Sequence, residues 1–137
     1  CLATDVSEGT AGNGERLVFV YDARKVRLGG VVAELVLPGD QEQLARTPFM
    51  VGFVSGWARF FLASVHIRCV SDDADDPARV REIQQVARLL AGRAEDKDSW
   101  ARNVLLIGDF NIFSTADDTF KALEDNGFVV PPPIMGA

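Results

Sequence analysis

An amphipathic helical pattern leads directly into a continuous apolar run, and few folds accommodate this combination. Asp76 and Pro77 form the N-cap and first-turn pair of a helix. Apolar residues then recur at helical spacing for about four turns, and the helix is expected to fade near Gly92. These apolar residues are Val80, Ile83, Val86, Ala87 and Leu90. The run "NVLLIG", Asn103–Gly108, shows no alternation, which predicts a strand buried on both faces.

The first half of the chain is dominated by short segments rich in β-branched and aromatic residues. They are Arg16–Asp22, Val31–Leu37, Phe49–Gly56 and Ala58–Ile67. Turn-forming residues separate them, which predicts strands. Because the gap between the last two is very short, we expect these two to form a hairpin.

A second, shorter helical pattern follows the apolar run. Ser114 and Asp117 resemble a capping box at its start, and Asn126-Gly127 is expected to end it. Taken together, the segments predict an α/β fold, in which a mixed sheet has helices packed on it. Residues 1–137 contain no linker or repeat, so we expect a single domain.

Charge and cysteine content restrict what the protein can bind. The formal net charge is −6, so a polyanion would have to be held locally, by a few arginines or by a metal ion. No apolar run approaches the roughly 18 residues of a transmembrane segment. Cys1 and Cys69 lack CxxC spacing, so no metal or redox motif is indicated. A small buried thiol at Cys69 is favoured over a disulfide between the two.

Polar residues stand at the ends of two apolar runs. Asp109 and Asn111 lie two apart just after the predicted strand, so in an extended chain they would face the same space while Phe110 turns into the core. Such a pair can orient water, hold a divalent cation or bind a phosphoryl oxygen, or it can simply form a turn. His66, the only histidine, ends another run, where it can meet a phosphate or serve as a structural hydrogen-bonding residue.

Four segments carry a resemblance to a known family. In chain order they are "GERLVFVYD", "RTPFMVGFVSG", "LASVHI" and "LLIGDFNIFS". They resemble the endonuclease/exonuclease/phosphatase superfamily, in particular its bacterial members, over nearly the whole chain. The resemblance implies a four-layered α/β sandwich of the deoxyribonuclease-like type. It also implies a hydrolase, a nuclease or phosphatase, that cleaves phosphoester bonds with Mg²⁺ or Mn²⁺.

The resemblance also implies roles for individual residues. Asp109 would orient or activate the attacking water, and Asn111 would bind the phosphoryl group. His66 would donate a hydrogen bond to the phosphate and would itself be held by Glu15. Arg46 would contact the phosphate. The alternatives are that Glu15 is a solvated acid at a strand edge and that Arg46 merely lies on a loop.

The family pattern extends past this sequence at both ends. The glutamate that binds the metal and a second, acid/base histidine have no counterpart here, so we expect a central portion of a larger domain. Metal ligands cannot be assigned within it. We expect this chain alone to be inactive or weakly active, and its exposed sheet edges to favour self-association. The phosphoester substrate would be a nucleic acid, a nucleotide or a phospholipid head group. The alternative function is a non-catalytic binding or assembly module on the same scaffold.

Overall fold

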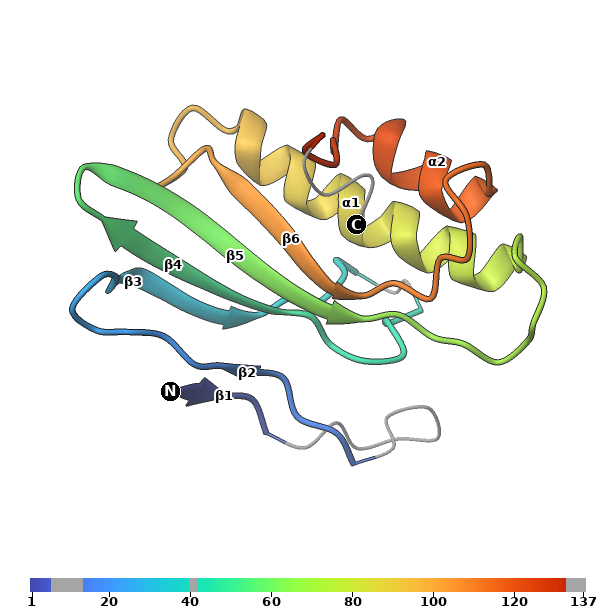
Figure 1. Cartoon of the computed structure of the whole chain (residues 1–137), viewed down its shortest axis with the longest axis horizontal. Helices are drawn as coiled ribbons and strands as arrows, with labels where there is room; N and C mark the ends of the chain where they lie inside the picture. Colours follow the sequence, from blue (N-terminus) through green and yellow to red (C-terminus); the bar gives the residue numbers. More distant parts are fainter. Residues whose placement is uncertain (6–13, 40–41, 133–137) are drawn as a thin grey trace.

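The computed structural model describes residues 1–5, 14–39 and 42–132, and these residues form a mixed α/β fold (Figure 1). A four-stranded sheet has the strand order β3-β4-β5-β6. Its strands are β3 (Arg27–Glu34), β4 (Phe49–Ser55), β5 (Ala58–His66) and β6 (Val104–Asp109). A two-stranded sheet contains β1 (Leu2–Ala3) and β2 (Val18–Phe19), and the helices are α1 (Pro77–Glu95) and α2 (Asp118–Glu124). The prediction of a mixed sheet with helices packed on it is confirmed.

Strand pairing places the carboxyl ends of two neighbouring strands at the same end of the sheet. β3 pairs antiparallel with β4, and β4 pairs antiparallel with β5, so the predicted hairpin is confirmed. β5 and β6 pair parallel, and α1 makes the long connection that parallel neighbours require. The carboxyl ends of β5 and β6 therefore lie side by side.

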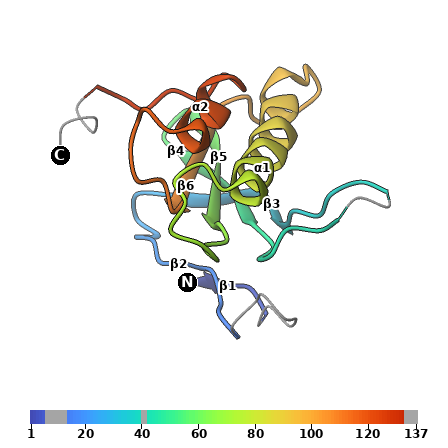
Figure 2. The ribbon, with the colours of Figure 1, turned by 90° about the vertical axis from the view of Figure 1, so that its right-hand side faces the viewer.

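The described elements form three layers. The helices cover one face of the four-stranded sheet, and the β1–β2 pair lies on the other (Figure 2). On the helix side, Val65 of β5 and Leu90 of α1 belong to one buried apolar cluster. On the other side, Val51 and Phe53 of β4 pack with Phe19 of β2. Both faces of the central strands are therefore covered, as their apolar sequences require.

β6 is not buried on both faces, so that prediction is wrong. Val104 and Leu106 pack against the helix-side core, whereas Leu105 and Ile107 are 47% and 43% exposed on the opposite face. The physical reason is position: β6 is the edge strand, and the β1–β2 pair packs beneath β4.

The predicted start of the third strand is also wrong, because β3 begins before Gly29-Gly30. The pairing of β3 with β4 shifts register between Leu28 and Val32, so both glycines lie inside an irregular strand. A Cβ atom at Gly29 would overlap the ring of Trp100, which lies over this part of the sheet. The two glycines therefore serve packing and a bulge, and they do not separate a turn from a strand.

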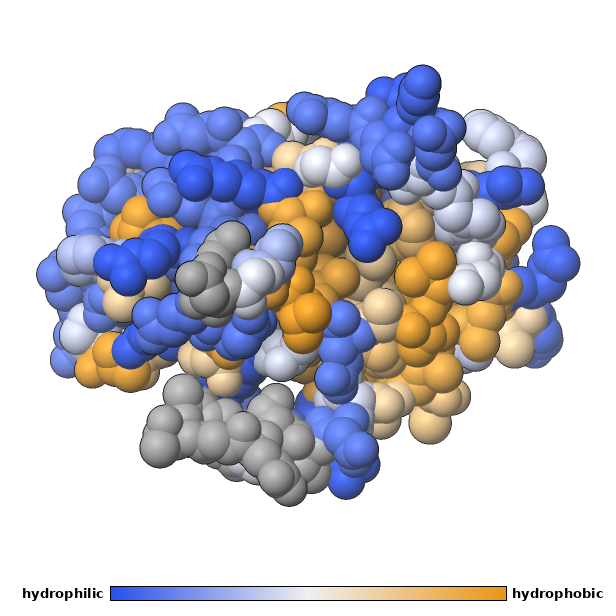
Figure 3. All heavy atoms as spheres, turned by 180° about the vertical axis from the view of Figure 1, so that it is seen from behind, coloured by the Kyte–Doolittle hydropathy of each residue, from blue (hydrophilic) through white to orange (hydrophobic). Residues whose placement is uncertain are grey.

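β3 is the opposite edge of the sheet and also leaves apolar side chains uncovered. Leu28 and Val32 are both exposed. Figure 3 shows apolar residues gathered on the back of the molecule, the side on which β3 lies. The predicted strand Arg16–Asp22 shrinks to the two residues of β2.

The helices differ from the predictions only at their ends. The side chain of Asp76 caps α1 as predicted, but the helix continues past Gly92 to Glu95. α2 begins one turn later than the capping box indicates, with Asp117 as its N-cap residue. It ends before Gly127, whose φ of +80° is the left-handed conformation that glycine adopts readily.

Cys1 and Cys69, both within the described residues, are free thiols. Cys69 is exposed, so the prediction of a buried thiol is wrong; it lies beyond the end of β5, outside the core. Among the described residues, neither helix is both long and apolar enough to cross a membrane.

Candidate active site

The parallel register of β5 and β6 places His66 directly beside Asp109. The two residues are Cα partners at the ends of their strands, on the sheet face opposite the helices. The distance between His66 Nε2 and Asp109 Oδ2 is 3.9 Å. Residues predicted independently at two strand ends thus come together in one place, where the Asp109 side chain is exposed.

Glu15 holds the other side of the histidine ring. Its Oε2 lies 2.6 Å from His66 Nδ1, a short hydrogen bond between residues far apart in sequence. Glu15 precedes β2, so the layer beneath the sheet supplies the carboxylate. With Nδ1–H donating to Glu15, the ring has a fixed orientation and its Nε2 faces Asp109.

Arg46 shares the same carboxylate oxygen. Its Nε lies 3.1 Å from Glu15 Oε2, and its side chain is only 9% exposed. The Nε is buried and makes no hydrogen bond with acceptable angles to the described residues, so the contact is an ion pair. Arg46 precedes β4, which means that three separate segments deliver Arg46, Glu15 and His66 to one cluster.

A buried carboxyl group, Glu82 on α1, lies near this cluster, and sequence reasoning missed it. Glu82 is 5% exposed, and burial raises the pKa of its carboxyl group. The charges of Arg68 and Arg46 act in the opposite direction. The backbone groups of Ala45 and Arg68 also lower the pKa of Glu82, so the segments before β4 and after β5 both lie close to this carboxyl group. The sequence did contain one indication that Glu82 is buried: it precedes Ile83, which belongs to the apolar face of the predicted helix.

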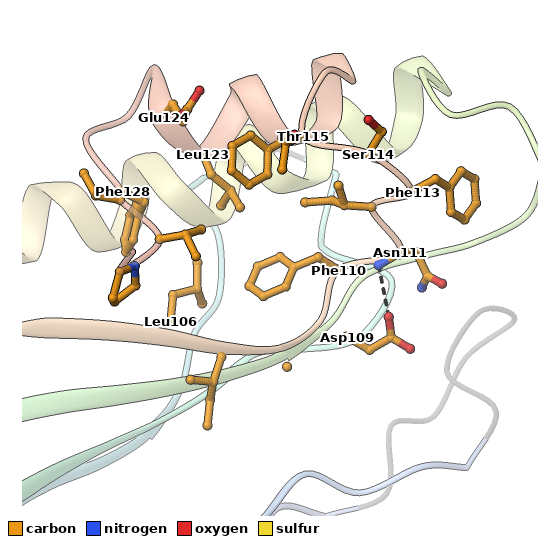
Figure 4. Close-up of a pocket in the computed structure, with 17 residues that line it drawn as sticks. Leu106, Asp109, Phe110, Asn111, Phe113, Ser114, Thr115, Leu123, Glu124 and Phe128 are labelled. Carbon is orange, nitrogen blue, oxygen red and sulfur yellow. Dashed lines mark hydrogen bonds between the residues drawn. The ribbon is translucent and has the colours of Figure 1, made fainter. Parts of the chain in front are cut away.

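The loop after β6 fixes both Asp109 and Asn111. Asn111 N donates to Asp109 Oδ1 (3.0 Å), and Asn111 Nδ2 donates to Ile67 O (2.7 Å). The expectation of an extended chain is wrong, because Asn111 has a φ of +51°. Both polar groups nevertheless point to the same side of the loop, away from the apolar side chains around Phe110 (Figure 4). Phe110 packs against the core as predicted.

An apolar hollow of about 970 Å³ lies on the other side of this loop, between β6, α2 and the segment after α2. Leu106, Phe110, Leu123 and Phe128 converge in it (Figure 4). Asp109 and Asn111 contribute to its rim, but their polar groups point away from it. The candidate chemistry therefore belongs to the open strand-end surface and not to this hollow.

The described part of the chain contains no group of three or more His, Cys, Asp or Glu side chains that could hold a metal ion. The exposed Asp109 carboxylate and the Asn111 amide oxygen are hard oxygen donors of the kind that Mg²⁺ prefers. Because Mg²⁺ keeps several waters and often takes only one or two protein carboxylates, these residues fit as part of a magnesium site.

Comparison with known proteins does not assign a family. No family model matches the chain, and a search of curated proteins gives no significant match. The geometry of Glu15, Arg46, His66, Asp109 and Asn111 is therefore the basis for assigning a function.

Proposed function

We propose that this chain is the core of a divalent-metal-dependent phosphodiesterase of the endonuclease/exonuclease/phosphatase type. One observation carries the proposal: His66 and Asp109 lie in register at two parallel strand ends, and Glu15 holds the far side of the histidine ring. If His66, Asp109 and Glu15 each had a separate structural role, there would be no reason for the three side chains to lie in contact. The three layers of the described elements are compatible with part of a four-layered sandwich.

Each side chain has a defined task in this proposal. The exposed carboxylate of Asp109 orients the attacking water and accepts its proton. The Asn111 amide carries a second N–H that Ile67 O does not use, and this N–H donates to a phosphoryl oxygen. His66 donates from Nε2 to another phosphoryl oxygen when its ring is protonated, since Glu15 already occupies Nδ1.

Arg46 adds positive charge beside the phosphate. Arg46 and the histidine ring both contact Glu15 Oε2, so one carboxylate sets the position of both groups. Local cations of this kind let a protein with a net charge of −6 hold a polyanion.

A bound Mg²⁺ or Mn²⁺ would neutralise charge on the phosphoryl oxygens and lower the pKa of the water. Asp109 would be its ligand in this chain. The substrate class is a phosphoester in a nucleic acid, a nucleotide or a phospholipid head group. With one carboxylate at the metal and a single histidine, the 137 residues alone are expected to be inactive or weakly active.

A second candidate function is a non-catalytic binding or assembly module. The observation that favours it is that these polar groups already contact other protein groups. Asn111 Nδ2 donates to Ile67 O. The ring of His66 lies between the carboxylates of Glu15 and Asp109. In that case the cluster holds loops together and contacts no phosphate.

The test is calorimetric titration of Mn²⁺ into the full chain, together with hydrolysis of bis-p-nitrophenyl phosphate. Asp109→Asn removes the charge and keeps the shape of the side chain. Asp125→Asn, at an exposed position at the end of α2, is the matched control. We expect Mn²⁺ binding that weakens on the order of tenfold or more in Asp109→Asn and not in the control.

Equal Mn²⁺ binding by the wild type and Asp109→Asn would contradict the proposal. A wild type that binds neither Mn²⁺ nor phosphate would favour the non-catalytic module.

A further inference from the structure

Arg79 of α1 is a charged residue in the interior of the protein. Its relative exposure is 0%, and it lies among the buried residues of the helix with Glu82 and Ile83. Arginine is almost never buried to this extent unless its donors are used. The proposed function assigns no role to it.

The guanidinium group joins two loops. Nη1 donates to Asn111 O (2.9 Å) in the loop after β6. Nη2 donates to Ser71 O (2.7 Å) and Asp73 O (3.1 Å) in the loop before α1. Its Cζ also lies 4.9 Å from the ring centroid of Phe113. Within the described residues the Nε of Arg79 has no hydrogen-bond partner. The hydrogen bonds of the guanidinium group to these loop carbonyls therefore come from Nη1 and Nη2.

The bond to Asn111 has a special consequence because Asn111 has left-handed backbone geometry, with a φ of +51°. Asparagine tolerates this conformation better than most L-residues, so its own preference and its surroundings together fix the backbone here. Asp109 Oδ1 holds the N–H of Asn111, and Ile67 O holds its side-chain amide. Arg79 holds the carbonyl on the other side, which completes the set of contacts that fix the residue.

We propose that Arg79 is a positioning residue of the phosphate site: it fixes the backbone of Asn111 and thereby aims the Asn111 amide. This inference rests on the proposed function, in which that amide donates to a phosphoryl oxygen. Because the donors of Arg79 end on backbone carbonyls, Arg79 itself touches no substrate.

The experiment compares wild type, Arg79→Lys and Arg79→Gln in the full chain. Leu90→Ala is the control, since Leu90 is equally buried on the same helix but packs only in the apolar core. Three readouts are taken: the NMR resonances and φ-dependent coupling of Asn111, the affinity for inorganic phosphate with Mg²⁺ present, and thermal stability.

We expect both Arg79 variants to change the Asn111 resonances and to weaken phosphate binding on the order of 10–100-fold. Arg79→Lys keeps the charge but cannot span both loops, so it should restore only part of the affinity. Leu90→Ala should lose stability while its phosphate affinity stays within about twofold of wild type. A folded Arg79 variant whose Asn111 resonances and phosphate affinity match those of the wild type would overturn the inference.

Two further outcomes have definite meanings. If the wild type binds no phosphate, the proposed function fails. The Asn111 resonances of the Arg79 variants then still show whether Arg79 fixes the Asn111 backbone, which is the clamp meant here. If the Arg79 variants do not fold, the wild type decides alone: separate Arg79 Nη proton signals with contacts to the Phe113 ring support the clamp, and a single averaged signal overturns it.

Discussion

Gly108 is the residue of β6 directly before Asp109, and two facts exclude a side chain there. Its φ is +134°, and a Cβ atom would overlap the backbone of Val65 on β5. We expect Gly108→Ala to destabilise the protein by about 3 kcal/mol or more, because strain and steric overlap act together. Urea unfolding followed by circular dichroism measures this change.

Gly92→Ala is the matched control for this substitution. Gly92 lies in α1 and is exposed, with open space where the Cβ atom would go. Alanine should therefore stabilise the helix by about 0.5–1 kcal/mol. Equal effects of the two substitutions would show that the strand end does not depend on close approach of β6 to β5.

Glu82 gives the protein a defined pH dependence. Burial raises the pKa of its carboxyl group in the folded state above the ordinary value of 4.5. The folded state then holds the proton more tightly than the unfolded state, so this contribution to stability is full below the ordinary pKa. It is lost as the pH rises through the raised pKa. Glu82→Gln cannot ionise, so we expect its unfolding free energy to decline less with rising pH.

Chemical denaturation at a series of pH values from about 4 to 8 tests this expectation. Glu95→Gln, at the exposed end of the same helix, is the control. If Glu82→Gln and wild type show the same pH profile, the buried carboxyl group does not govern stability in this range.

The polar residues of the site could be predicted from the sequence, but some of the contacts that fix their positions could not. Asp109 and His66 were visible because each ends an apolar run, and Glu15 and Arg46 came from a resemblance. Arg79 and the left-handed backbone of Asn111 were not visible. A buried arginine that binds loop carbonyls has no local pattern, since its partners lie in other segments.

At the level of elements, the start of α1 is the most strongly specified boundary. Asp76 Oδ1 accepts hydrogen bonds from Ala78 N (2.8 Å) and Arg79 N (3.3 Å), and Oδ2 accepts from Ser71 Oγ (2.8 Å). The bond from Ser71 is the main cause of the lowered pKa of Asp76, and the bond from Ala78 N comes next. This cap also sets the position of Arg79.

We expect Asp76→Ala to destabilise the protein more than Asp76→Asn at neutral pH, because asparagine can still cap the helix. The lowered pKa means that the charged cap contributes above the ordinary value of 3.8 and that its contribution is lost as the pH falls through the folded value. Both variants should therefore show a weaker loss of stability on acidification. Thermal melts at acidic and neutral pH measure it, and identical melts for the two variants would argue against a cap.

Element types were predictable and element edges less so. The helical spacing of α1 and the hairpin of β4 and β5 are local patterns, which the sequence contains in full. The burial of β6 is not local, because it depends on what covers the far face. The same is true of β3 and β4, where Trp100 from a distant segment occupies the space above Gly29 of β3 and Gly52 of β4.

At the scale of the whole molecule, one face of the edge strand β6 carries apolar side chains that the described elements leave partly uncovered. Leu105 and Ile107 lie there side by side with the exposed edge of the sheet. We propose that copies of the chain associate through this face, because an apolar edge strand is a ready template for pairing. The association should then depend on protein concentration.

Leu105→Lys tests this proposal away from the polar site. Burial of one leucine contributes about 1.5 kcal/mol, so its replacement should weaken association by roughly tenfold. Val36→Lys is the control, since Val36 is exposed but lies outside every strand. Sedimentation velocity over a wide concentration range should show Leu105→Lys shifted toward the monomer and Val36→Lys unchanged. If both variants behave like wild type, the β6 face does not mediate association, and the edge formed by β3 becomes the next surface to test.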